Sequence, residues 1–131
     1  MNKLSLFIAE DSELMCTRLA QILSEIEGTE ILGFAFTVPD AFRYLDKIKP
    51  DIAILDICMP GGTGMDILKR IRKDGNHTKV IIYTHYPYPQ YQKRCMQLGA
   101  DYFFDKYTEF EKLFQVVKDL VRQRCAESAP R

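Results

Sequence analysis

The sequence is poor in the patterns that build metal, disulfide or membrane structures. It has only two histidines, His77 and His85, and no C-x-x-C pair. Its four cysteines are scattered at Cys16, Cys58, Cys95 and Cys125. Neither a zinc site nor a disulfide framework is therefore expected. There is no leader segment and no long apolar run, so we expect no membrane span, and free thiols in a cytoplasmic location.

The chain also lacks an excess of charge of either sign. Eighteen basic residues balance eighteen acidic ones, which excludes a global attraction to nucleic acid or anionic lipid. At 131 residues, 47% of them hydrophobic, the chain can bury one sizeable core. We expect a single domain over residues 1–125 and a short polar tail over residues 126–131.

Five short apolar runs recur along the chain, at residues 4–9, 31–36, 52–55, 80–83 and 102–104. They are mostly continuous rather than alternating, which is typical of strands covered on both faces. Segments with helical periodicity lie between and after them, and strand and helix alternate five times. This order predicts an α/β fold with a doubly wound parallel sheet of five strands and helices on both faces.

The helix boundaries follow from periodicity and capping residues. The first helix has an apolar stripe from Met15 to Ile26 and is expected to end at Gly28. Further helices are expected at residues 40–48, 65–73 and 90–98. The last has capping-box spacing between Thr108 and Glu111 and is expected to end near Arg124.

Chemically active side chains follow four of the five strands. Glu10 and Asp11 follow the first, Asp56 the third and Thr84 the fourth, and Lys106 lies just past the fifth. In a parallel sheet these positions share one edge, where function gathers. Three neighbouring carboxylates would repel one another unless a cation lay among them, and an oxygen-rich site without histidine suits Mg²⁺.

This combination predicts phosphoryl transfer. A carboxylate nucleophile at Asp56 would form an acyl phosphate, while a divalent cation, the Thr84 hydroxyl and the Lys106 ammonium stabilise its charge. The turn at Met59, Pro60 and Gly61 is expected to expose Asp56. Each residue also has a structural interpretation, in which the acidic pair is a solvated loop and Asp56 caps the third helix.

The motifs that carry these residues resemble the receiver family of two-component response regulators, over about residues 3–124. The similar segments are Ile8-Ala9-Glu10-Asp11-Ser12, Leu55-Asp56-Ile57-Cys58-Met59-Pro60-Gly61, Thr84, and Gly99-Ala100-Asp101 leading to Lys106. The resemblance implies a flavodoxin-like sheet with strand order 2-1-3-4-5. It also implies a phosphoprotein that serves as a signalling phosphoacceptor rather than an enzyme acting on other molecules.

The resemblance further implies a set of roles. Glu10, Asp11, Asp56 and the backbone carbonyl of Cys58 would hold Mg²⁺, and Phe103 would be a rotating aromatic switch beside Thr84. The phosphoryl donor would be a phosphohistidine on a sensor histidine kinase or a phosphotransfer protein. The fourth helix, last strand and last helix would form an output surface for a homodimer or a target protein, with no nucleic acid bound by this chain.

Two positions depart from the family pattern. Tyr107 replaces the proline that commonly follows the lysine, so we expect a trans Lys106–Tyr107 bond. A bulky loop, His85-Tyr86-Pro87-Tyr88-Pro89, replaces a small residue after Thr84. With Cys58, this loop is expected to exclude water from the site, which predicts slow autodephosphorylation.

Three other functions fit the same architecture less well. A haloacid dehalogenase-type phosphatase needs a second acid at position 58, where this chain has Cys58. A flavodoxin-like cofactor binder would place phosphate at the first loop, where Glu10 and Asp11 repel it. A receiver-like binding module without phosphorylation would not need the complete acidic set.

Overall fold

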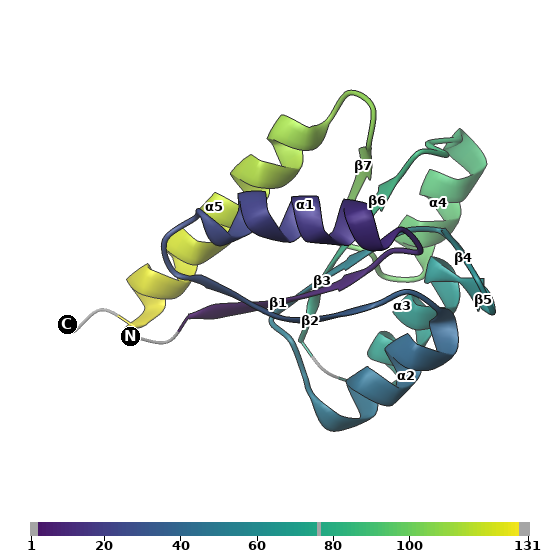
Figure 1. Ribbon diagram of the computed structural model, residues 1–131, viewed down its shortest axis with the longest axis horizontal. Helices are drawn as coiled ribbons and strands as arrows, with labels where there is room; N and C mark the ends of the chain where they lie inside the picture. The colour runs from purple at the N-terminus through teal and green to yellow at the C-terminus, as the bar shows by residue number, and fades with distance from the viewer. Residues whose placement is uncertain (1–2, 76, 129–131) are drawn as a thin grey trace.

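A computed structural model describes residues 3–75 and 77–128 of the chain (Figure 1). A five-stranded parallel sheet has the order β2-β1-β3-β6-β7, which confirms the order 2-1-3-4-5 expected for the five strands. Its strands are β1 (Leu4–Ala9), β2 (Thr29–Ala35), β3 (Ile52–Leu55), β6 (Lys79–Thr84) and β7 (Tyr102–Asp105). The helices are α1 (Glu13–Ser24), α2 (Val38–Lys47), α3 (Gly64–Lys73), α4 (Pro89–Gln97) and α5 (Phe110–Ser128).

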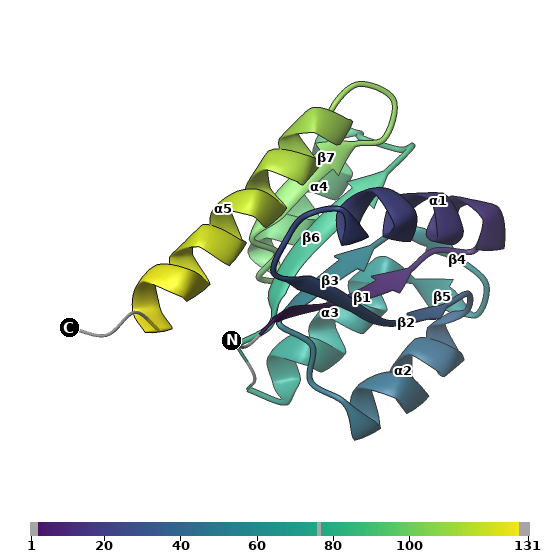
Figure 2. The ribbon, with the colours of Figure 1, turned by 60° about the vertical axis from the view of Figure 1, so that its left-hand side comes forward.

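Helices lie on both faces of the sheet, as Figures 1 and 2 show, and a hydrophobic layer fills the space on each face. Successive residues of a strand face opposite sides, so Leu6 and Ile8 of β1 pack beneath α1 and α5. Phe7 and Ala9 point the other way, into the layer formed with α2, α3 and α4. The central strand β3 is buried throughout, whereas the edge strand β7 is half-buried along its whole length. Continuous burial was therefore a correct expectation for the centre of the sheet and wrong for both edges, since β2 is also mostly half-buried or exposed.

The first helix ends earlier than its apolar stripe suggests. Its last residue is Ser24, and Gly28 lies beyond it, in the turn before β2, with a φ of 96°. The Leu4 amide donates to the Gly28 carbonyl at 2.7 Å, so this glycine serves the entry to the sheet rather than the end of the helix. The expectation that Gly28 caps the helix was wrong.

The start of α5 also differs from the expected capping box. The helix begins at Phe110, and the Thr108 hydroxyl donates to the Asp105 carboxylate instead of capping with Glu111. The Glu109 carboxylate accepts the Asp105 amide at 3.0 Å, which closes the loop after β7. At its other end α5 continues to Ser128, past the expected end near Arg124.

A short hairpin that the sequence did not reveal follows β3. Strands β4 (Cys58–Met59) and β5 (Gly62–Thr63) pair antiparallel around Pro60 and Gly61, whose φ of 84° suits glycine. The Pro60 carbonyl accepts the Val38 amide at 3.0 Å, so α2 supports the hairpin.

Within residues 3–75 and 77–128, no helix combines the length and apolar content needed to cross a bilayer. All four cysteines are free thiols, two of them buried and two exposed.

Candidate functional site

Backbone hydrogen bonds align the carboxyl ends of the strands. The Asp56 amide donates to the Ala9 carbonyl at 3.0 Å, and the Lys106 amide donates to the Thr84 carbonyl at 2.9 Å. These bonds bring the residues after β1, β3, β6 and β7 to one edge of the sheet. The residues that were predicted to share one edge of the sheet therefore do lie there.

A buried ion cluster lies at this edge. The Lys106 ammonium donates to Glu10 Oε2 at 2.6 Å and to Asp56 Oδ2 at 2.8 Å. Only 5% of the Lys106 side chain is exposed, and only 8% of each carboxylate side chain. The other Asp56 oxygen, Oδ1, accepts the Ile57 amide at 2.7 Å. Both oxygens of Asp56 are thus held in place before any ligand binds.

The two buried carboxyl groups titrate in opposite directions. Burial, and then hydrogen bonding with Asp56, raise the pKa of Glu10 to about 7, against the opposing effect of Lys106. Burial also disfavours the Asp56 anion, but bonds from Glu10, Lys106 and the Ile57 amide outweigh it and lower the pKa of Asp56. The pKa of Lys106 is raised, because its two carboxylate partners outweigh its burial. Asp56 therefore remains an anion at neutral pH.

Asp11 completes an oxygen cluster on the solvent side. Glu10, Asp11 and Asp56 each offer a carboxylate oxygen, and these three atoms lie within 4.8 Å of one another. Asp11 is exposed, whereas the other two are buried. Carboxylate oxygens are the ligands that Mg²⁺ prefers, and a divalent cation here would also favour the ionised form of Glu10, whose pKa is raised to about 7. The donor set fits Mg²⁺.

Asp56 is not exposed, contrary to the expectation from the turn that follows it. The residue is 7% exposed, because Lys106 pairs with its carboxylate and the start of α3 packs against its backbone. A Cβ added to Gly64 would lie 2.0 Å from the Asp56 backbone oxygen, so this close approach requires glycine. Asp56 also does not cap α3. Thr63 occupies that position, with its amide donating to Asp66 Oδ2 at 2.9 Å.

Within the described residues the Thr84 hydroxyl makes no hydrogen bond to Glu10, Asp56 or Lys106, and Phe103 lies on the edge strand β7. Thr84 is fully buried, and its hydroxyl accepts the Tyr86 amide at 3.0 Å. Phe103 is half-buried and packs into the layer on the α4 side of the sheet. Their roles as switch residues stay predictions, as does the role of the Cys58 carbonyl.

The aromatic rings of the loop after β6 contact one another and the loop after β7, and the exclusion of water from the site stays a prediction. Tyr86 is 42% exposed and makes a tilted contact with Tyr88, at 6.4 Å between ring centroids. The His85 ring instead stacks on Tyr107, with centroids 4.4 Å apart, and so joins the loops after β6 and β7. The Lys106–Tyr107 bond is trans, as expected.

One residue at this site, Tyr83, was not predicted from the sequence. The Lys106 ammonium lies 5.9 Å from the centre of the Tyr83 ring, on the α1–α5 side of the sheet. Tyr83 was regarded only as part of an apolar strand. Its position directly before Thr84 was the one available signal.

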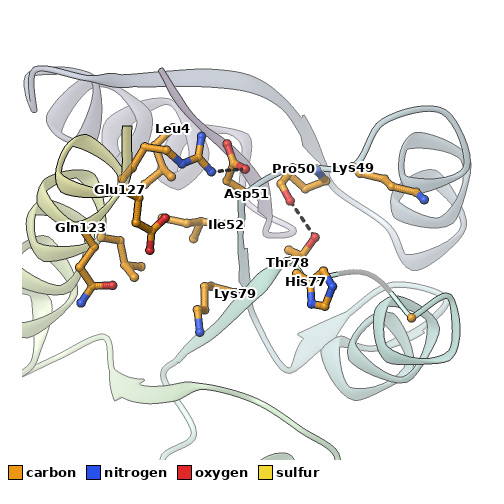
Figure 3. A pocket seen from close by; sticks show the side chains of 13 residues that line it. Leu4, Lys49, Pro50, Asp51, Ile52, His77, Thr78, Lys79, Gln123 and Glu127 are labelled. Atoms are coloured by element: carbon orange, nitrogen blue, oxygen red, sulfur yellow. Dashed lines mark hydrogen bonds and ion pairs between the residues drawn. The ribbon is translucent and has the colours of Figure 1, made fainter. Parts of the chain in front are cut away.

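A pocket of about 480 Å³ lies at the opposite edge of the sheet, where β1, β3 and β6 begin (Figure 3). There Arg124 donates to the Asp51 carboxylate at 2.7 Å, and the Thr78 hydroxyl donates to the Pro50 carbonyl at 2.7 Å. These polar groups hold α5 and neighbouring loops together. The acidic edge, with its cluster of buried charges, is therefore the stronger candidate for chemistry.

Comparisons with known proteins agree with this geometry. Residues 6–118 match the response regulator receiver domain. The transcriptional regulatory protein DesR of Bacillus subtilis is 30% identical over 118 residues, which cover 90% of this chain but 58% of DesR. A LuxR-family DNA-binding response regulator from Staphylococcus aureus is similar in structure, with a TM-score of 0.82 and 32% identity over 89% of this chain and 98% of that chain. A receiver domain of a DNA-binding response regulator from Colwellia psychrerythraea has a TM-score of 0.84 and 31% identity, over 92% of this chain and all of that chain.

The chain thus spans a little over half the length of DesR, and the match covers the part that holds the acidic edge. The match to the family over residues 6–118, together with the fold and the strand order, shows that the chain belongs to the response regulator receiver domain family.

Proposed function

We propose that this receiver domain accepts a phosphoryl group on Asp56 from a phosphohistidine of a sensor histidine kinase or phosphotransfer protein. One observation carries the proposal: Asp56 is a buried, ionised carboxylate that directly follows the central strand and is held between Lys106 and the Ile57 amide. A nucleophile fixed in this way loses little freedom on reaching the transition state. The four free thiols fit the reducing cytoplasm, where we propose that the chain acts.

The acidic cluster would hold Mg²⁺ through Glu10, Asp11 and Asp56, and through the Cys58 carbonyl by family resemblance. When bound, the cation would neutralise charge on the transferred group and on the carboxylates. Lys106 pairs with both Glu10 and Asp56, so a bound cation would share these two carboxylates with its ammonium.

In the transfer step, an oxygen of Asp56 attacks phosphorus and forms an acyl phosphate bond. The bond between phosphorus and the donor's imidazole nitrogen breaks, and its electron pair stays on that nitrogen. The Lys106 ammonium lies 2.8 Å from Asp56 Oδ2, so it would pair with the phosphoryl oxygens as negative charge moves onto them. The Thr84 hydroxyl, which now accepts the Tyr86 amide, would turn to donate to a phosphoryl oxygen.

We propose that this reorientation of Thr84 changes the face formed by α4, β7 and α5. Phe103 lies on the α4 side of β7 and could move into space that Thr84 vacates. Exposed aromatic residues border this face, including Tyr88 and Tyr107. They would contact a second copy of the chain or a target protein once the switch has moved.

A phosphatase of the haloacid dehalogenase type remains the second candidate because it uses the same nucleophile. Against it, Cys58 is exposed and its pKa is raised by burial and by the nearby Asp56 and Asp11 carboxylates. That thiol makes a poor acid for a leaving group, so stable labelling of Asp56 is expected rather than turnover of phosphoesters.

The test is the intact mass of the protein after incubation with acetyl phosphate and Mg²⁺. We expect one added phosphoryl group in the wild type and none in Asp56→Asn. Asp46→Asn, which changes an exposed aspartate away from the edge, is the control and should label normally. Equal labelling of Asp56→Asn would refute the assignment, and rapid release of phosphate from phosphoesters would favour the phosphatase.

A further inference from the structure

We propose that a cavity between α1 and α5 is a binding site for a compact, uncharged aromatic molecule with one hydrogen-bonding group. This α1–α5 pocket has a volume of about 210 Å³ and lies above the ends of β1, β3 and β6. Its apolar walls are formed by Ile8, Met15, Leu19, Ile54, Tyr83 and Phe110. Glu10, Asp56 and Lys106 close one end, and Arg18 lies at the rim.

The size of the pocket limits its ligand to one or two rings. An apolar protein cavity of about 150 Å³ is enough to bind benzene. The α1–α5 pocket is somewhat larger, so a single substituted ring fits, while most drug-sized molecules need about 300 Å³ or more. The walls come from rigid strands and helices rather than loops, so the space is formed in advance.

The hydroxyl of Tyr83 identifies the polar group that the ligand should carry. Tyr83 lines the pocket, and its hydroxyl makes no hydrogen bond to another group of the described residues 3–75 and 77–128, although solvent can reach it. A ligand that displaces water from this hydroxyl leaves it unsatisfied unless the ligand supplies a hydrogen bond of its own. The ligand should therefore donate or accept a hydrogen bond at one end.

The charges at the end of the pocket favour an uncharged ligand. Glu10 and Asp56 would repel an anion, whereas a cation would have to compete with the 2.6 Å and 2.8 Å bonds that Lys106 already makes. A neutral ring avoids both costs. It would still contact Asp56 and Lys106, since both line the pocket.

Entry from solvent is available along α1. Ile22, which also lines the pocket, is 38% exposed, and Leu19 is only half-buried. Neighbouring Leu14 is 59% exposed and does not line the pocket, which makes it a control position on the same helix.

Phenol and toluene are suitable probes, followed by two-dimensional NMR of the whole chain. We expect phenol to shift resonances of pocket residues with a dissociation constant in the millimolar range, as ligands of this size allow. Toluene should bind roughly 2- to 10-fold more weakly, because it cannot bond to Tyr83. In Tyr83→Phe this preference should disappear while toluene binding persists.

A second variant tests the location directly. Leu19→Phe places a larger side chain in the pocket wall and should weaken the binding of both probes. Leu14→Phe should leave the affinity for both probes unchanged. Absence of saturable shifts in the wild type, or equal weakening by both phenylalanine variants, would overturn the proposal.

A consequence for signalling rests on the proposed phosphorylation of Asp56. Because a bound ring contacts Asp56 and Lys106, phenol should slow labelling by acetyl phosphate in the wild type and less so in Leu19→Phe. If Asp56 is not labelled at all, the proposed function fails while the NMR result still decides the pocket. Saturable binding without any effect on labelling would reject this regulatory role.

Discussion

Replacing Lys106 by methionine tests the buried ion cluster most directly. Lys106→Met keeps the length and apolar stem of the side chain and removes only the charge that pairs with Glu10 and Asp56. Removing one partner of a buried ion pair costs about 3–5 kcal/mol, because the remaining charges stay buried without compensation. We expect a loss near the lower limit, since Glu10, with a pKa already raised to about 7, can take up a proton.

The loss should depend on pH in a defined direction. The folded pKa of Glu10 lies above its ordinary value of 4.5, so between these two values the folded state binds more protons than the unfolded state. Stability therefore falls as the pH rises through this range. In Lys106→Met the pKa of Glu10 should rise further, and the difference from the wild type should be larger at about pH 8.5 than at about pH 6.5.

Urea unfolding in EDTA measures this loss. Lys112→Met is the matched control, because Lys112 also pairs with a carboxylate, Glu109 at 2.8 Å, but is 68% exposed and should lose no more than about 1 kcal/mol. Adding Mg²⁺ should stabilise Lys106→Met more than the wild type, because the variant's cluster carries one more uncompensated negative charge. If Lys106→Met lost as little free energy of unfolding as Lys112→Met in EDTA at every pH, the cluster would not be a buried ion pair in solution.

Three shorter predictions concern the frame of the site. Tyr44→Phe should leave stability unchanged or raise it by up to about 1 kcal/mol in urea unfolding, because the buried Tyr44 hydroxyl lacks a partner within the described residues. Asp51→Asn should lose about 1.5–3 kcal/mol at neutral pH. Hydrogen bonds and Arg124 outweigh burial and lower the pKa of Asp51, so the two stability curves should converge as the pH falls below about 3.8. Gly64→Ala should cost roughly 1–3 kcal/mol and reduce labelling, because its Cβ would clash with the Asp56 backbone; normal values in both assays would contradict this.

The sheet could be predicted from sequence because its signal is local and repeated. Each central strand is a run of apolar residues, and both faces of β3 are in fact covered. The residues after the strands then converge because parallel strands end at the same edge, which requires no knowledge of side-chain contacts. This is why Glu10, Asp56 and Lys106 could be placed together from their order in the chain alone.

What the sequence did not predict depends on contacts between distant or competing groups. Thr108 has good capping spacing, but Glu109 reaches the Asp105 amide and α5 begins later. Asp56 is buried where Lys106, 50 residues further along the chain, pairs with its carboxylate and where the start of α3 packs against its backbone. Neither outcome is visible in the local pattern, because each depends on which of several possible partners a group contacts in the folded chain.

We predict that the lifetime of the proposed phosphorylated state depends on the stacked pair His85–Tyr107 rather than on Tyr86. The sequence predicted slow autodephosphorylation because the loop after β6 would exclude water. In the structure Tyr86 is 42% exposed and its ring contacts that of Tyr88, with centroids 6.4 Å apart. His85 is half-buried, and its stack on Tyr107 ties together the two loops that carry Thr84 and Lys106.

Loss of this stack should open the path of water toward Asp56. An aromatic pair contributes about 0.5–1.5 kcal/mol beyond its buried area, which corresponds to a roughly 2- to 12-fold change in how often the loops part. We therefore expect the acyl phosphate of His85→Ala and of Tyr107→Ala to decay up to about tenfold faster than that of the wild type, and Tyr86→Ala to decay at the wild-type rate. Intact-mass measurements over time after removal of the phosphodonor give these rates. Unchanged decay in His85→Ala and Tyr107→Ala would show that the stack does not restrict water, and faster decay in Tyr86→Ala alone would restore the original assignment to that ring.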